Sequence, residues 1–419
     1  MSRWRLEFRS GRRWAVPAVA AAACALTGCG GHAADHAGIR VSASSALADQ
    51  AIKTTVTGLV PGQQVTITAQ TGDADHRVWR SQDTFNAGPD GTVNLASADP
   101  AVGGSYINPD GMGPFWSMDA VTGGDNEYFT PAQPQDQSSV KVRLTVTSAG
   151  RVLAARTVTR NYMVPGETAR VLTLRPSGVA GVLFLPPPGT PRHPGVLLFG
   201  GAEGGMAQTF TAALLAAHGY PALTVAYFAW PGLPDQLQNI PLEYFVTAGR
   251  ILASQPAADP AHLLTLGYSR GTEAALLLAD HFPQLFHGAI VYSPSYYINP
   301  ASSSTDEPAW TLGGQPVMPN PVPLDQVSGP VLAIAGDSDA IWDSETSASR
   351  ISAELGVDGS RYSHQAEIYL SAGHGVGTFP YEPIGSGALD VTGGTRAGDV
   401  AAQRSSWAKV LSLLAGLGG

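Results

Sequence analysis

The sequence almost lacks cysteine: its 419 residues contain only two, Cys24 and Cys29, and both lie near the N-terminus. No thiol follows Cys29, so the rest of the chain cannot form a disulfide bond or use a thiolate nucleophile. Metal sites that depend on cysteine ligands are excluded there for the same reason. Any nucleophile or ligand in the folded part must come from other residue types.

Charge is also scarce, and acidic residues are in excess. Charged residues make up 14% of the chain, with 33 acidic against 24 basic residues and a formal net charge of −9. No polybasic stretch follows the extreme N-terminus, so nucleic acid is not an expected partner. Hydrophobic residues reach 44%, with 49 glycines and 32 prolines, which is typical of a globular, loop-rich protein. The length suits two domains.

The N-terminal apolar run is too short to cross a membrane. Residues 14–26 are mostly apolar and follow five arginines, a pattern typical of a secretory signal. The run ends in Leu26-Thr27-Gly28-Cys29, which resembles the bacterial lipobox, where the cysteine is lipidated and becomes the new N-terminus. We therefore expect residues 1–28 to be a lipoprotein signal peptide, with Cys29 as the lipidation site and residues 29–38 as a tether.

This interpretation implies an exported protein. The lipid on Cys29 anchors it to the outer face of the bacterial cell membrane, which is then a partner of the N-terminus. The alternative is a plain signal peptide that is cut near Ala33-Ala34. Arg12-Arg13 additionally suggests twin-arginine export of a folded protein.

Residues 39–163 have the pattern of an N-terminal β-sandwich domain. Short segments alternate between apolar and polar residues, and turn formers such as Gly88-Pro89-Asp90-Gly91 separate them. No long helical pattern interrupts the series, so we expect an all-β, immunoglobulin-like sandwich. Strands are expected at 40–43, 54–57, 65–68, 92–95 and 140–146.

The pattern changes near residues 164–168, and residues 168–419 are expected to form an α/β domain. Continuous apolar segments of strand length alternate there with helical stretches, which is typical of a mostly parallel sheet covered on both faces. Expected strands lie at 196–199, 222–226, 263–266, 289–292 and 331–334, and expected helices lie near 207–218, 242–255 and 271–282.

A G-x-S-x-G motif, Gly267-Tyr268-Ser269-Arg270-Gly271, lies between an expected strand and an expected helix. This is the context of a nucleophile elbow, where the glycines permit a turn too sharp for a Cβ atom and the serine hydroxyl is exposed at the helix N-terminus. Ser269 is therefore the candidate nucleophile. A serine hydroxyl needs a base and an orienting carboxylate to react at neutral pH.

The base and the acid are expected downstream, because α/β-hydrolases place their triad in the chain order Ser, acid, His. His374 follows the expected strand 366–369, whereas His364 precedes that strand and would lie at the opposite end of the sheet. We assign His374 as the base. Three carboxylates follow the expected strand 331–334. Asp339 is the preferred acid, with Asp337 and Asp343 as alternatives.

A glycine-rich loop, Gly200-Gly201-Ala202-Glu203-Gly204-Gly205, follows the expected strand 196–199. Such a loop can bring a backbone N–H toward the carbonyl oxygen of a substrate, while the amide after the nucleophile supplies a second donor. The candidate oxyanion-hole donors are the amides of Gly201, Ala202 and Arg270. A phosphate-binding loop is the alternative, but no G-x-x-x-x-G-K-[ST] motif is present.

Several further segments, in order along the chain, carry a specific resemblance. They are Gly103-Gly104-Ser105-Tyr106, Met112-Gly113-Pro114-Phe115-Trp116-Ser117-Met118, Tyr162-Met163-Val164-Pro165-Gly166, Gly181-Val182-Leu183-Phe184-Leu185-Pro186-Pro187, Phe199-Gly200-Gly201, Leu242-Glu243-Tyr244-Phe245 and Gly336-x-x-Asp339-x-x-Trp342. The chain thereby resembles the acyl-CoA thioesterase and bile acid-CoA:amino acid N-acyltransferase family. The resemblance implies a β-sandwich packed on an α/β-hydrolase domain, with a triad at Ser269, Asp339 and His374.

The residue at the elbow separates two activities within that family. Amino-acid-conjugating members use cysteine there, and the thioesterases use serine. Ser269 therefore predicts hydrolysis through a serine acyl-enzyme that water resolves, with no metal and no organic cofactor. The expected substrate is a small-molecule acyl thioester or carboxylic ester. An exported, acidic protein fits poorly with polyanionic coenzyme A esters, so the family alone does not assign the substrate.

Two other functions stay open. One is a lactone or dienelactone hydrolase, or a peptidase, that uses the same triad. The other is a noncatalytic surface lipoprotein in which the hydrolase fold is a platform. The proline-rich stretch 294–330 is expected either to form a wall or lid over an acyl pocket or to be a solvated connection.

Overall fold

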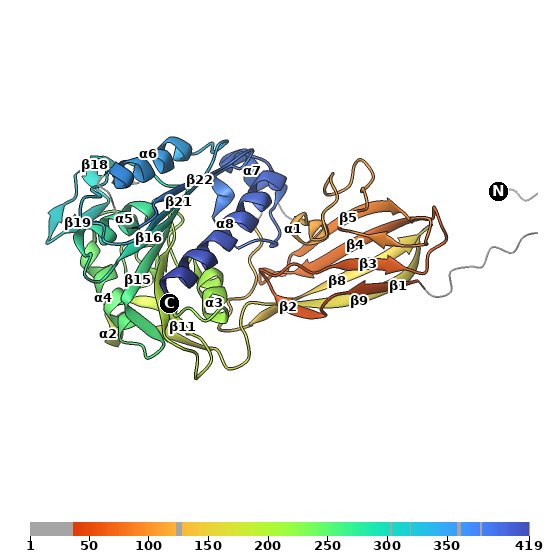
Figure 1. Cartoon of the computed structure of the whole chain (residues 1–419), viewed down its shortest axis with the longest axis horizontal. Helices are drawn as coiled ribbons and strands as arrows, with labels where there is room; N and C mark the ends of the chain where they lie inside the picture. The colour runs from red at the N-terminus through yellow and green to blue at the C-terminus, as the bar shows by residue number, and fades with distance from the viewer. Residues whose placement is uncertain are drawn as a thin grey trace, which may run out of the picture.

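The computed structural model describes residues 37–122, 128–301, 304–318, 320–357, 362–377 and 379–418. These residues form two domains that lie side by side, an all-β domain at the right of Figure 1 and an α/β domain at the left. The expected lipobox, the lipidation site Cys29 and the arginine pair lie outside the described residues. Among the described helices, none is both long enough and apolar enough to cross a bilayer.

The first domain is a sandwich of two sheets that share one core. Its strands are β1 (Gly38–Val41), β2 (Ser45–Leu47), β3 (Thr54–Thr57), β4 (Gln64–Gly72), β5 (Val78–Asn86), β6 (Val93–Asn94), β7 (Asp119–Ala120), β8 (Ser139–Ser148) and β9 (Arg151–Asn161), with a short helix α1 (Gly113–Trp116). The smaller sheet has the order β1-β3-β6, and the larger has the order β2-β9-β8-β4-β5-β7. Trp79 and Phe85 from the larger sheet pack with Val56 and Val93 from the smaller one. Burial alternates along β4, because successive side chains of a strand point to opposite faces.

The second domain is built on one eight-stranded sheet. Its strands are β10 (Thr168–Leu172), β11 (Ala180–Leu185), β12 (His193–Phe199), β13 (Ala222–Ala226), β15 (Ala258–Tyr268), β16 (Gly288–Tyr292), β21 (Val331–Gly336) and β22 (Gln365–Tyr369). The order is β10-β11-β13-β12-β15-β16-β21-β22, and the strands from β13 to β22 run parallel. Strand β11 runs antiparallel to β13. This sheet, with helices on both faces, confirms the expected α/β-hydrolase architecture.

Helices α4 (Leu242–Ala253), α5 (Gly271–His281) and α6 (Ser344–Val357) cover one face of the sheet, and α3 (Thr209–Ala217) and α8 (Arg396–Leu417) cover the other. The central strands are buried on both faces, so their side chains divide between two cores. Leu197 and Phe199 of β12 pack with α4 and α5, whereas Val196 and Leu198 pack with α3 and α8. The sequence pattern predicts α3, α4 and α5 within a few residues and does not predict α6 or α8.

The described residues of the proline-rich stretch 294–330 pack against the α/β domain and are not a solvated connection. It contains β17 (Pro300–Ala301), β18 (Ser304–Pro308), β19 (Trp310–Leu312) and β20 (Gln315–Pro316), and β19 pairs with β14 (Ile240–Pro241). Trp310 is fully buried, with its ring centroid 5.6 Å from that of Tyr227 and 6.2 Å from that of Phe245. We call residues 294–330 the wall segment.

Buried contacts join the two domains. Asp49, just after β2, accepts hydrogen bonds from His218 Nε2 at 2.5 Å and from Trp407 Nε1 at 2.7 Å. Leu47 packs in a core of the second domain, and Val400 of α8 packs in the core of the first. These contacts hold the α/β domain against the sandwich.

Glu167, at the junction between the domains, makes folding stability depend on pH. Its Oε2 accepts the Val164 amide at 3.0 Å, while its buried Oε1 has no hydrogen-bond partner among the described residues. Burial raises the pKa of the Glu167 carboxyl from 4.5 to about 8, although the Val164 amide opposes this. The protonated form is thus favoured in the folded state. Its stabilising contribution is complete below the unfolded pKa and is lost as the pH rises through about 8.

We predict that Glu167→Gln stabilises the protein at pH 9 relative to wild type, because it removes the cost of ionising a buried carboxyl. The gain in unfolding free energy is expected to be roughly 2–4 kcal/mol at pH 9 and less than about 1 kcal/mol at pH 5. Urea unfolding at both pH values measures it, with the exposed Glu345→Gln as the control. An equal effect of Glu167→Gln at both pH values contradicts the prediction.

Candidate active site

Ser269 lies where β15 ends and α5 begins, at the carboxyl edge of the sheet. Its φ is +54°, in the left-handed region that residues with a Cβ rarely adopt. The flanking glycines make the turn possible. A Cβ at Gly267 would lie 2.4 Å from the Gly271 carbonyl oxygen, and one at Gly271 would lie 2.3 Å from the Gly200 oxygen. The close backbone packing at this junction therefore leaves room only for glycine on either side of Ser269.

The structure brings together the three residues that the sequence assigns to a triad. The Oγ of Ser269 lies 2.9 Å from His374 Nε2, and His374 Nδ1 lies 2.8 Å from Asp339 Oδ2. Asp339 follows β21, and His374 follows β22, so all three come from the carboxyl ends of parallel strands in one sheet. Ser269 and His374 are buried, with 7% and 5% of their surfaces exposed. The arrangement allows a proton to pass from the serine to the imidazole.

The protonation states follow from the environment of Asp339. Burial acts to raise the pKa of the Asp339 carboxyl. The hydrogen bond from His374, the His374 charge and the Ile341 amide lower this pKa by more than burial raises it, so the net pKa is below its usual value. Asp339 is thus ionised at neutral pH and can only accept hydrogen bonds. In the neutral imidazole of His374, Nδ1 must therefore carry the proton, which leaves Nε2 as an acceptor for the Ser269 hydroxyl.

Neighbouring groups fix the backbone and the ring of His374. Tyr268 Oη and Ser293 Oγ donate to its carbonyl oxygen at 3.1 and 2.8 Å. The Trp342 ring stands nearly perpendicular to the imidazole, with centroids 5.6 Å apart. Just before it, the Gly373 amide donates to Asp399 Oδ1 at 2.7 Å. The imidazole is held in one orientation before any substrate binds.

The alternative acid and base residues have other partners. Asp337 Oδ1 accepts the Ser371 amide at 2.7 Å, which braces the loop before His374. Asp343 Oδ1 accepts the Thr346 amide at 3.0 Å in the first turn of α6. His364 immediately precedes β22 and therefore lies at the other end of the parallel strands from Ser269. The geometry favours Asp339 over both alternative carboxylates.

The oxyanion-hole assignment needs one correction. The Gly201 amide donates to both Glu203 carboxylate oxygens at 2.9 Å, so it is not free to bind a substrate oxygen here. Neither the Ala202 amide nor the Arg270 amide donates to a backbone carbonyl in the described residues. Tyr227 Oη donates to the Gly200 carbonyl oxygen at 2.8 Å, which steadies the loop. Ala202 and Arg270 remain the candidate donors.

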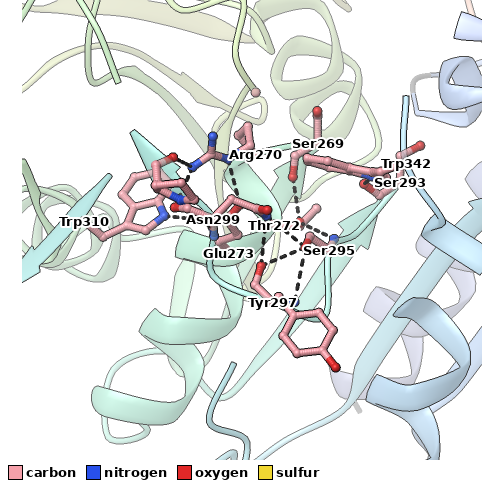
Figure 2. A network of polar contacts seen from close by, with 12 residues as sticks. Ser269, Arg270, Thr272, Glu273, Ser293, Ser295, Tyr297, Asn299, Trp310 and Trp342 are labelled. Atoms are coloured by element: carbon pink, nitrogen blue, oxygen red, sulfur yellow. Dashed lines mark hydrogen bonds and ion pairs between the residues drawn. The ribbon is translucent and has the colours of Figure 1, made fainter. Parts of the chain in front are cut away.

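Two carboxylates near the elbow, those of Glu203 and Glu273, were not assigned from the sequence. Glu203 folds back over its own glycine-rich loop, and desolvation raises the pKa of its carboxyl against the opposing effect of the Gly201 amide. Glu273, in the first turn of α5, is fully buried and pairs with Arg270 at 2.7 Å (Figure 2). The spacing of Arg270 and Glu273 by three residues on an otherwise apolar helix is the sequence signal for this second carboxylate.

Comparisons with known proteins identify the family of this chain. Residues 49–173 match the model of the acyl-CoA thioester hydrolase/BAAT N-terminal region, and residues 307–416 match that of the BAAT/acyl-CoA thioester hydrolase C-terminal region. Together they cover more than half of the chain. The chain belongs to the acyl-CoA thioester hydrolase/BAAT family. The resemblance inferred from the sequence motifs is confirmed, and so is the expectation of a hydrolase-class enzyme.

The alignments with named relatives cover both domains of this chain. Acyl-coenzyme A amino acid N-acyltransferase 1 of Mus musculus is 29% identical over 406 residues, 88% of this chain and 94% of that protein. Acyl-coenzyme A thioesterase 1 of Rattus norvegicus is 28% identical over 368 residues, 81% of this chain and 85% of that protein. A dienelactone hydrolase-like phosphotriesterase from metagenomic libraries aligns with 61% of this chain and all of its own, at 16% identity and a TM-score of 0.43.

We predict that Asp339→Asn and Asp337→Asn differ sharply in activity. An asparagine in place of Asp339 cannot hold the required tautomer of His374, so kcat should fall by about 10⁴-fold, whereas Asp337→Asn should change kcat by only a few-fold. Steady-state hydrolysis of an aryl ester measures both. Thermal unfolding of each variant serves as the folding control. Equal losses of kcat in two folded variants would reopen the choice of acid.

Proposed function

We propose that this protein is a serine hydrolase that cleaves acyl thioesters or carboxylic esters through a covalent acyl-enzyme. The observation that carries the proposal is the continuous hydrogen-bonded path from Ser269 Oγ through His374 to the ionised Asp339, with distances of 2.9 and 2.8 Å. The buried, pre-oriented imidazole is what a serine needs to react at neutral pH.

Acylation begins when Ser269 Oγ attacks the carbonyl carbon of the substrate. His374 Nε2 takes the hydroxyl proton as the new C–O bond forms, and the carbonyl electron pair moves onto the oxygen. The Ala202 and Arg270 amides are the candidate donors to that oxyanion, and each such donor typically contributes about 3 kcal/mol. His374 then gives its proton to the leaving thiol or alcohol as the carbonyl re-forms.

Deacylation repeats the sequence with water as the nucleophile. His374 Nε2 takes a proton from the water as its oxygen bonds to the acyl carbon, and then returns the proton to Ser269 Oγ as the ester bond breaks. Water activated by His374 resolves this serine ester, so we propose hydrolysis in place of transfer to an amine. This choice rests on the serine at the elbow and agrees with the thioesterases among the relatives.

The relatives' names point to acyl-CoA as a substrate class, whereas the acidic chain offers no long-range attraction to a polyanion. We therefore keep acyl thioesters and carboxylic esters as one proposed substrate class. Hydrolysis of short- and long-chain p-nitrophenyl esters, measured beside acyl-CoA of matched chain length, separates the two. A lactone or dienelactone substrate would appear as activity on cyclic esters alone.

We predict that a fluorophosphonate probe labels the wild-type protein at Ser269 and leaves Ser269→Ala unlabelled. The probe reacts only with a serine that is activated by its base. Peptide mapping of the labelled protein identifies the site. If the folded wild-type protein takes up no label, the fold acts as a noncatalytic platform and the proposal fails.

We also propose that the protein is exported and held on the membrane by lipid on Cys29, which rests on the lipobox-like Leu26-Thr27-Gly28-Cys29 alone. Cys29→Ser should release the protein from the membrane fraction of the expressing bacterium with unchanged turnover. Fractionation with an activity assay measures both, and Cys24→Ser is the matched control. A Cys29→Ser protein that stays with the membrane contradicts the lipidation.

A further inference from the structure

A buried polar network lies directly behind the nucleophile elbow, outside the triad (Figure 2). Arg270 Nε donates to Glu273 Oε1 at 2.7 Å, and the Arg270 Nη2 group donates to the carbonyl oxygens of Asn299 and Pro300 at 3.0 and 2.9 Å. The guanidinium thus joins the first turn of α5 to the wall segment. The same residue, Arg270, carries the backbone amide that is a candidate oxyanion donor.

Glu273 is the centre of this network. Its side chain is fully buried, and its two oxygens accept from four N–H groups: Arg270 Nε at 2.7 Å, Asn299 Nδ2 at 2.9 Å, the Asn299 amide at 3.2 Å and Trp310 Nε1 at 2.8 Å. Every one of these partners is a donor, which suits a carboxylate and not an amide. A glutamate carboxylate can accept from all four donors together, whereas a glutamine amide would turn an N–H toward some of them.

A second path returns from the wall segment to Ser269. Asn299 Nδ2 donates to Ser295 Oγ at 3.0 Å, and the Ser295 amide approaches Thr272 Oγ1 at 3.4 Å. The Thr272 hydroxyl donates to the Ser269 carbonyl oxygen at 2.6 Å. The contacts therefore close a ring that holds the peptide between Ser269 and Arg270 from both sides. That peptide contains the Arg270 N–H.

We propose that Glu273 and Arg270 are positioning residues that aim the Arg270 amide at the substrate oxyanion, an inference that rests on the proposed function. The Thr272 amide also donates to the Ser269 carbonyl oxygen at 3.0 Å, so the first turn of α5 orients one side of the peptide that follows the strained residue Ser269. The ring of contacts holds the Arg270 side of that peptide, and the wall segment supports the ring because Trp310 is packed among aromatic side chains.

Stability alone is a weak reason for such a pair. Well-packed apolar residues often replace a buried ion pair without loss of stability, because desolvation offsets most of the attraction between the charges. The charged pair instead fixes an orientation. A planar guanidinium that is held by three acceptors restrains the backbone of the residue that carries it. A donor displaced by about 1 Å costs on the order of a hundredfold in rate.

The test measures oxyanion stabilisation separately from the amount of folded enzyme. An aryl ester and its thiono analogue, which carries C=S in place of C=O, are hydrolysed by the same protein. Sulfur is a weak hydrogen-bond acceptor, so an aligned amide favours the oxygen substrate much more than the sulfur one. Misfolding lowers both rates equally and leaves their ratio unchanged, whereas a misaligned Arg270 amide lowers the ratio.

Glu273→Gln places an amide donor among N–H donors, and Arg270→Lys keeps the charge but loses the planar fork. We expect each to lower kcat for the ester about tenfold or more, with KM within about twofold, and to lower the oxo-to-thiono ratio by a similar factor. The matched control is Glu243→Gln, because Glu243 Oε1 accepts the Gly313 amide of the same wall segment at 2.7 Å but does not touch the elbow. It should keep the wild-type ratio.

The double variant Arg270→Met/Glu273→Gln leaves no unpaired ion and guards against a failure to fold. We expect it to recover thermal stability without recovering the ratio. Wild-type ratios in the folded variants overturn the positioning role while the hydrolase proposal stands. Absence of hydrolysis by the wild type with both substrates, and by the Glu243→Gln control, rejects the hydrolase proposal itself.

Discussion

The position of the Ser269 hydroxyl depends on one strained residue. Ser269 can meet His374 only because its backbone turns back with a φ of +54°, and that turn exists only because glycines flank it. The glycines also let the Gly200 loop come close: a Cβ at Gly201 would lie 2.6 Å from the Cβ of Ser269. One backbone constraint therefore sets the position of the candidate nucleophile and of the glycine-rich loop beside it.

The sheet converts this local constraint into a site. Strands β15, β21 and β22 run parallel and end at the same edge, so the residues that follow them meet although they are far apart in sequence. The β-sandwich contacts α8 and the C-terminal end of α3 through Asp49 and Leu47. The elbow itself belongs to the α/β domain. The wall segment packs behind the elbow, where Trp310 and Asn299 donate hydrogen bonds to Glu273 of α5.

Much of this could be predicted from the sequence, because strand periodicity and the strand–elbow–helix motif are local patterns. The triad residues followed from chain order, but the choice between Asp337 and Asp339 needed the loop conformation, since both follow β21. Helix α8 was missed because its many alanine, glycine and serine residues give little apolar contrast. The ring around Glu273 could not be predicted, because Asn299 and Trp310 come from a stretch without helix or strand periodicity. The capping of Gly201 by Glu203 depends on a side-chain rotamer that no pattern encodes.

The most direct test of the account is the mass of the intact protein during turnover. Rapid acid quenching of an ester or thioester reaction, followed by mass spectrometry and peptide mapping, should find one acyl group covalently bound to Ser269. An acyl group on another residue during turnover would contradict an acyl-enzyme at Ser269. Turnover without any adduct, both in the wild type and in a variant slowed in deacylation, would contradict it as well.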